Sequence, residues 1–275
     1  MTRIADLLKG DFRKPIEEII KVNNTDEETV YTELTEYIAT DRIKGEYERL
    51  FRAMADAPKT PNEGVGVWIS GFFGSGKSSF AKNLGYVLAN RTVLGKSASD
   101  LFVAQVDQRN ITNFVKFLNS SVPCEVFMFD VQVDLSVQTN AERIAEVMYR
   151  VLLRELDYAE DYDIADLEIE LEREGKLEAF KDLCQRRYKD DWRRIRKGAQ
   201  KFARTSAILH DLERGTYKSE DTWLQSVKAR PVQRLTVKDI VERCFDLCAK
   251  RRPGKAFAFI VDESQLQPIG PRSLS

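Results

Sequence analysis

The chain has 275 residues, of which 43 are Lys or Arg and 44 are Asp or Glu, so its formal net charge is −1. This balance excludes a protein that binds nucleic acid through its overall charge, and any such contact would need a local basic patch. Hydrophobic residues make up 43% of the chain and charged residues 32%, which provides material for a core and predicts long solvated helices.

The start of the chain and its cysteines indicate a soluble, cytoplasmic protein. Residues 1–15 are charged throughout and lack the apolar region of a signal peptide. No run reaches the ~18 apolar residues of a membrane span. Cys244 and Cys248 lie one helical turn apart, but the one histidine, His210, offers no second ligand pair, so we expect free thiols and no zinc site.

Residues 1–60 are predicted to form an N-terminal helical segment. Thr25 and Glu28 have the spacing of a capping box with Thr25 as N-cap. Apolar residues then recur at helical spacing. They are Val30, Leu34, Tyr37 and Ile38, followed over residues 43–57 by Ile43, Tyr47, Leu50, Phe51 and Met54.

Strands and helices are expected to alternate in the next part of the chain. The apolar runs 65–70, 125–133 and 256–262 are typical of buried parallel strands. Residues 77–90 and 141–156 read as helices, the first with Phe80, Leu84, Val87 and Leu88 facing inward. This alternation predicts an α/β fold with a parallel sheet.

A charged helical insertion is expected at about 157–230. Residues 154–174 are rich in Asp and Glu, residues 186–204 are rich in Arg and Lys, and both contain apolar residues at helical spacing. A further helix is predicted over residues 235–250, with Thr236 as N-cap and Asp239 three residues later.

The segment Gly71–Ser78 matches the phosphate-binding pattern G-x-x-x-x-G-K-[ST] in full. The glycines allow backbone N–H groups to surround a phosphate, and the following helix adds the positive end of its dipole. Lys77 would contact the β- and γ-phosphates, and the Ser78 hydroxyl would hold Mg²⁺. The predicted nucleotide-binding residues are Gly71, Phe72, Phe73, Gly74, Ser75, Gly76, Lys77, Ser78 and Ser79.

The acidic partner of this loop is predicted at the end of the strand 256–262. Asp262 would bind Mg²⁺ and Glu263 would polarise the attacking water, so Lys77, Asp262 and Glu263 are the candidate catalytic residues. Asp130 and Asp134, near the end of the strand 125–133, either face the nucleotide or serve as helix caps and solvated charges.

A basic stripe is formed by Arg193, Lys197, Lys201 and Arg204 beside Trp192. One interpretation is a DNA-contacting face. The alternative is that these charges pair with the acidic segment 154–174 or are simply solvated, and the near-cancellation of charge over the chain favours it.

Several segments resemble the BREX-system P-loop protein family BrxC and its relative PglY of the phage growth limitation system. They are KPIEEIIKV at 14–22, ELTEYIAT at 33–40, GVWISGFFGSGKS at 66–78 and FIVDE at 259–263. The resemblance implies a bacterial antiphage defence ATPase in a multi-protein complex that includes a DNA methyltransferase. It assigns nucleotide, Mg²⁺ and hydrolysis roles to Lys77, Ser78, Asp262 and Glu263.

The chain departs from this family after Glu263. The family continues with a sequence similar to Val-Gly-Gln, whereas residues 264–275 resemble neither strand nor helix. Proteins of this class place two further strands after this point, one between the strands that carry the two motifs. The resemblance therefore implies an incomplete P-loop NTPase sheet of the ASCE or AAA-like type, from a truncated product or a fragment.

The sequence thus predicts a helical segment over residues 1–60 and a P-loop NTPase domain over residues 61–275. The expected function is an ATP- and Mg²⁺-binding module that drives a conformational change in a defence complex. No acceptor site is visible, which argues against a small-molecule kinase. The alternatives are a non-catalytic assembly platform, with self-association among its contacts, and a DNA-contacting module.

Overall fold

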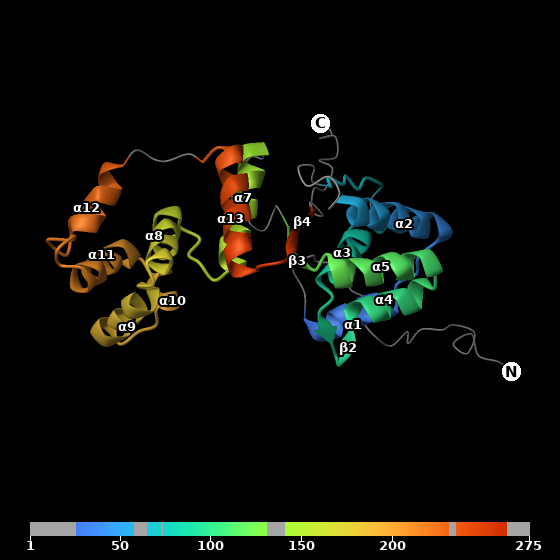
Figure 1. The fold of residues 1–275 in the computed structure, drawn as a ribbon, viewed down its shortest axis with the longest axis horizontal. Helices are drawn as coiled ribbons and strands as arrows, with labels where there is room; N and C mark the ends of the chain where they lie inside the picture. Colours follow the sequence, from blue (N-terminus) through green and yellow to red (C-terminus); the bar gives the residue numbers. More distant parts are fainter. Residues whose placement is uncertain (1–25, 58–64, 73, 131–140, 231–234, 263–275) are drawn as a thin grey trace, which may run out of the picture. The chain divides into compact units, whose positions relative to one another are not determined.

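A computed structural model describes residues 26–57, 65–72, 74–130, 141–230 and 235–262. Over these residues the protein is a mostly helical α/β structure with two small two-stranded sheets and no closed sheet (Figure 1). The chain divides into two compact units, Met1–Ser121 with Ile260–Ser275, and Val122–Phe259. Among the residues so described, no helix is both long enough and apolar enough to cross a bilayer.

The first unit consists of helices and one short hairpin. Its elements are α1 (Glu27–Thr35), α2 (Asp41–Asp56), α3 (Lys77–Ala89), β1 (Thr92–Val93), β2 (Lys96–Ser97), α4 (Ala98–Val106) and α5 (Arg109–Ser121). The strands β1 and β2 pair antiparallel. Within this unit, α1 packs against α3 and α4, and α2 packs against α5. The predicted domain boundary at residue 60 stays a prediction.

The N-terminal helices form where the sequence pattern predicts them, with two corrections. The cap of α1 is Asp26, whose side chain accepts a hydrogen bond from the Thr29 N–H at 2.9 Å, whereas the predicted cap Thr25 lies outside the described residues. Helix α1 ends at Thr35, so Ile38 is exposed instead of facing the core. The predicted apolar face of α2 is confirmed, because Tyr47, Leu50 and Phe51 are buried.

Helices α4 and α5 fill a stretch for which the sequence pattern made no prediction. Ser97 caps α4 by accepting from the Asp100 N–H, and α5 buries Ile111, Val115 and Leu118 at the spacing of one helix face. Their presence gives α2 and α3 a helical layer to pack against.

The predicted buried strand at 65–70 is wrong. The segment belongs to neither sheet of the described residues, and Val65, Val67 and Trp68 are exposed, Trp68 at 86%. A strand gains its hydrogen bonds and its burial from neighbouring strands. Residues 65–70 are apolar, but no described strand pairs with them, so they do not form a strand.

The second unit holds the parallel sheet and the charged helical insertion. Its elements are β3 (Cys124–Asp130), α7 (Ala141–Glu155), α8 (Tyr162–Arg173), α9 (Leu177–Tyr188), α10 (Trp192–Ile195), α11 (Lys201–Leu212), α12 (Thr222–Ala229), α13 (Val237–Arg251) and β4 (Ala256–Asp262). The last residues of β4, from Ile260, are counted with the first unit.

Strands β3 and β4 pair in parallel, as predicted for two of the three expected strands. The Ala256 N–H donates to the Pro123 carbonyl at 2.9 Å, and the rings of Phe127 and Phe259 lie 5.2 Å apart. The two pairs have nearly the same offset in sequence, 133 and 132 residues, as expected of strands that run in the same direction. The described part of residues 125–133 is a strand as far as Asp130.

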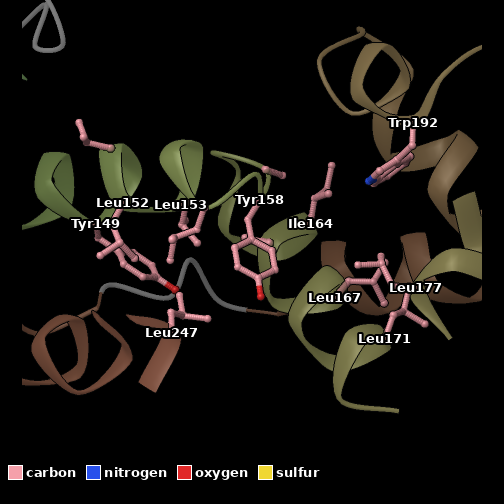
Figure 2. Packing of buried hydrophobic residues seen from close by; sticks show 14 of the residues in the cluster. Tyr149, Leu152, Leu153, Tyr158, Ile164, Leu167, Leu171, Leu177, Trp192 and Leu247 are labelled. Atoms are coloured by element: carbon pink, nitrogen blue, oxygen red, sulfur yellow. The ribbon is translucent and has the colours of Figure 1, made fainter. Parts of the chain in front are cut away.

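Helices α7 and α13 are packed together beside this sheet. Helix α13 begins with the predicted capping box, in which Thr236 and Asp239 exchange hydrogen bonds with each other's backbone N–H groups. Figure 2 shows Tyr149, Leu152 and Leu153 of α7 and Leu247 of α13 in the buried cluster that continues into the insertion.

A buried ion pair fixes the helices of the insertion to one another. The carboxylate of Glu168 on α8 accepts from the Trp192 indole N–H at 2.5 Å, from Arg196 Nη1 at 2.8 Å and from the Ala159 N–H at 2.6 Å. The Glu168 side chain is 2% exposed and that of Arg196 is 8% exposed. A buried carboxylate with three donors ties α8 to the start of α10.

We predict that Glu168→Ala lowers the free energy of unfolding of the second unit by about 3 kcal/mol, because it leaves Arg196 and two N–H donors buried with fewer acceptors. Urea unfolding followed by the fluorescence of Trp192 and Trp223 in a Trp68→Phe background measures this change. Glu178→Ala, which removes a carboxylate that is 82% exposed, should change the free energy by less than about 0.5 kcal/mol. Equal effects of the two substitutions would contradict the assignment.

We predict that Trp68 is accessible to solvent, because residues 65–70 do not form a buried strand. Trp192 and Trp223 are buried, so Trp68 should account for most of the fluorescence that iodide quenches in the folded protein. Trp68→Phe should remove most of this quenching, whereas Trp223→Phe should leave it. Retention of the quenching in Trp68→Phe would mean that residue 68 is protected, as in a buried strand.

Candidate functional site

The glycine-rich loop folds back on itself immediately before α3. The Ser75 N–H donates to the Phe72 carbonyl at 3.2 Å, which closes a tight turn. Gly74 and Gly76 have φ values of +76° and +85°, a region that disfavours other residues. A Cβ added to Gly71 would lie 2.7 Å from Ser75 Oγ, so the loop also passes close to its own beginning.

The side chains of the motif gather around this turn. Lys77 Nζ bends back over the loop and donates to the Phe72 carbonyl at 2.9 Å. Ser78 and Ser79 lie half-buried in the first turn of α3, where the Ser79 carbonyl accepts from Asn83 Nδ2. Of the predicted nucleotide-binding residues, Phe73 alone lies outside the described residues, and the other eight belong to one continuous loop and helix start.

The first turn of α3 has free hydrogen-bond donors. Its N-cap is Gly76, which has no side chain to accept from the backbone, and the first helical bond runs from the Phe80 N–H to the Gly76 carbonyl. The N–H groups of residues 77–79 therefore have no acceptor within the helix. Together with the helix dipole, these donors and the Lys77 ammonium favour an anion at this position.

Helix α3 is held by two contacts that the sequence pattern did not reveal. The Tyr47 hydroxyl of α2 donates to the Phe80 carbonyl at 3.0 Å, and the two rings stack with their centroids 4.1 Å apart. On α3, Lys82 Nζ and the Tyr86 hydroxyl donate to the two oxygens of Glu33 at 2.7 and 2.8 Å. The sequence contained one signal of the second contact, namely that Lys82 lies on a helix face whose other residues were predicted to be buried. This signal did not identify Glu33 as its partner.

Burial, followed by the negative charge of Glu33, raises the pKa of Tyr86 far above its usual range. Burial likewise raises the pKa of Tyr47 well above its usual range. Both hydroxyls therefore stay protonated at any physiological pH and remain donors to Glu33 and Phe80.

The predicted acidic residues lie at the ends of β3 and β4. Asp262 closes β4, and its Oδ2 atom is buried without a hydrogen-bond partner among the described residues. Asp130 is a buried residue at the end of β3, while Glu263 and Asp134 lie outside the described residues.

Ser78 and Asp262 each carry oxygen atoms of the kind that Mg²⁺ prefers. The described residues contain no cluster of three or more His, Cys, Asp or Glu placed to hold a metal ion. Magnesium does not require such a cluster, because it is commonly bound through one or two protein oxygens together with phosphates and water. The Ser78 hydroxyl and the unsatisfied Asp262 Oδ2 fit that chemistry.

The basic stripe is largely engaged in pairs within the second unit. Arg193 Nη2 lies 2.6 Å from Asp157 Oδ2, and Lys201 Nζ lies 2.8 Å from Asp161 Oδ2. The guanidinium of Arg204 stands over the Tyr188 ring, 4.9 Å from its centroid. A break between α10 and α11 also interrupts the helix that would align the stripe. Arg193 and Lys201 therefore pair with the acidic segment 154–174, as the alternative interpretation predicted.

Three of the four cysteines are buried as free thiols, and the fourth, Cys124, is partly buried. Burial raises the pKa of Cys184 and of Cys244 to about 12 and that of Cys248 to about 11. These thiols therefore resemble small core residues and lack the low pKa of nucleophilic cysteines.

No protein-family model matches the chain, and no solved structure matches it.

The raised pKa values predict slow thiol modification in the folded protein. Because the thiolate is the reacting form, Cys184, Cys244 and Cys248 should react with an aromatic disulfide at pH 8 roughly 100-fold more slowly than free cysteine, and faster as the pH rises toward 11. Absorbance of the released thiol, recorded in buffer and in denaturant, measures this difference. Equal rates under the two conditions would contradict the burial of these residues.

Proposed function

We propose that this chain is an ATP-binding P-loop NTPase module of the BrxC kind, which works in bacterial defence against phage. ATP and Mg²⁺ are its cofactors in this proposal. Binding and release of the nucleotide would change the conformation of the module within a defence complex.

The loop geometry is the observation that carries this proposal. A left-handed turn at Gly74 and Gly76 leads into an uncapped helix, with the Lys77 ammonium folded over the same turn. A phosphate at the start of α3 would accept from the free N–H groups and compete with the Phe72 carbonyl for Lys77. Triphosphates suit such a site because they offer several anionic oxygens to one row of donors.

The proposed roles of Asp262 and Glu263 rest on the sequence pattern and on the unsatisfied Oδ2 atom of Asp262. A bound Mg²⁺ supplies electrostatic stabilisation of phosphate charge. Ser78 and Asp262 would hold the ion through their oxygens, and Glu263 would orient and polarise the attacking water. The unsatisfied Oδ2 atom of Asp262 supports this role, since a buried carboxylate oxygen without a donor is costly unless a ligand or water satisfies it.

The defence role and its partners come from the sequence resemblance alone. The strings at 14–22, 33–40, 66–78 and 259–263 support a place in a BREX-type complex that includes a DNA methyltransferase. A second candidate function, a non-catalytic assembly platform, is favoured by the exposed segment 65–70, which does not join a sheet in the described part of the chain.

The direct test is nucleotide binding by wild type and Lys77→Ala. Loss of the ammonium should raise the Kd for Mg·ATP by about tenfold to a hundredfold, because a charged hydrogen bond to phosphate is removed. Isothermal titration calorimetry measures the Kd, and phosphate release measures turnover. Lys116→Ala removes an exposed lysine of the same unit on α5 and should leave the Kd unchanged.

Two outcomes separate the candidate functions. Binding with turnover that Asp262→Asn abolishes supports the ATPase, and binding without turnover in wild type supports the platform. Failure of wild type to bind Mg·ATP, or equal affinity in wild type and Lys77→Ala, would contradict the proposed site.

A further inference from the structure

A buried ion pair connects the helix of the phosphate loop to the first described helix of the chain. Lys82 on α3 is 1% exposed and Glu33 on α1 is 17% exposed, with 2.7 Å between Nζ and Oε1. Tyr86, one turn further along α3, donates to the other oxygen of the same carboxylate. Two donors on one face of α3 thus depend on a single acceptor on α1.

The loop has little other support in the described part of the first unit. The segment before it, 65–70, is exposed and lies outside both sheets. The support on the other side comes from α3, which is packed against α1, α4 and α5 and receives the Tyr47 hydrogen bond from α2 at Phe80. The position of the loop residues therefore depends on how firmly α3 is docked on these helices.

We infer that Glu33 is a positioning residue for the phosphate loop, and that through it the occupancy of the loop is coupled to the docking of α1. This inference rests on the proposed function. Glu33 acts through Lys82 and Tyr86, five and nine residues after Lys77 in the same helix.

The coupling follows from the cost of leaving Lys82 buried without its counter-ion. Removal of one partner of a buried ion pair destabilises a protein far more than removal of both. The remaining charge then has neither water nor a counter-ion to solvate it. Without Glu33, α3 would spend more time undocked, and ligand affinity falls in proportion to the fraction of molecules in the competent state. By reciprocity, a ligand on the loop must strengthen the docking of α1.

The test compares Glu33→Gln with a matched control in the full chain, with Mg·ATP as probe. Glu33→Gln removes the charge and replaces one acceptor oxygen by an NH₂ group that faces a donor. We expect the Kd to rise about tenfold, which corresponds to a docked fraction of about one tenth.

Glu48 of α2 supplies the control. Its carboxylate is 20% exposed and accepts from Arg52, Gln108 and Asn110, so it has similar burial to Glu33 and one donor more, but none of these three donors is on α3. Glu48→Gln should lower the thermal midpoint without raising the Kd. The triple variant Glu33→Leu, Lys82→Met and Tyr86→Phe removes both charges and the second donor, and it should return the Kd to within about threefold of wild type.

Hydrogen exchange provides a readout that a merely structural residue would not change. Without nucleotide, exchange in α1 should be faster in Glu33→Gln than in wild type, and saturating Mg·ATP should restore the protection of α1 in the variant, because the nucleotide binds only the docked state. An unchanged Kd in Glu33→Gln, or an equal rise in Glu48→Gln, overturns the positioning role alone. Failure of wild type to bind overturns it together with the proposed function.

Discussion

The start of α3 imposes the constraint on which the candidate site depends. A helix begins with N–H groups that have no intrahelical acceptor, and several helices of the described residues satisfy part of this need with a side chain, as Asp26, Thr40, Ser97 and Thr236 do. The cap of α3 is a glycine in the left-handed region, which cannot accept. A lysine ammonium folded over the same turn adds positive charge, so the local chemistry favours an anion.

Helix α3 was predicted to follow a buried strand at 65–70, but it packs against other helices instead. Its contacts in the described residues are to helices, and its polar anchors are the stacked Tyr47, the shared carboxylate of Glu33 and the Ser99 hydroxyl, which donates to the Val87 carbonyl. Such anchors are specific, because each aligns with one face and one register of α3, and a lone buried ammonium would be costly. The same arrangement connects the glycine-rich loop with the N-terminal helices, which were predicted only as a separate helical segment.

Local signals predicted most of the helices and two of the strands, and long-range contacts explain what they missed. The capping box at Thr236 and the apolar run 256–262 depend on neighbouring residues, so both could be read from the sequence. The run 65–70 is apolar like β4, yet strand formation requires a partner strand that no local pattern specifies. Glu33 and Lys82 are 49 residues apart, and their pairing depends on the packing of α1 against α3. The glycines and Lys77 could be identified because the loop is contiguous, whereas Asp262 required an inference across the fold.

The backbone amides of the loop provide the most direct test of the central claim that residues 74–79 bind polyphosphate. Amide resonances of isotope-labelled protein, recorded with and without Mg·ATP, would report on each N–H group in turn. We predict that the signals of Gly74, Gly76, Lys77 and Ser78 shift and that their exchange with solvent slows on nucleotide addition. Unchanged signals over residues 74–79 at saturating nucleotide would contradict it.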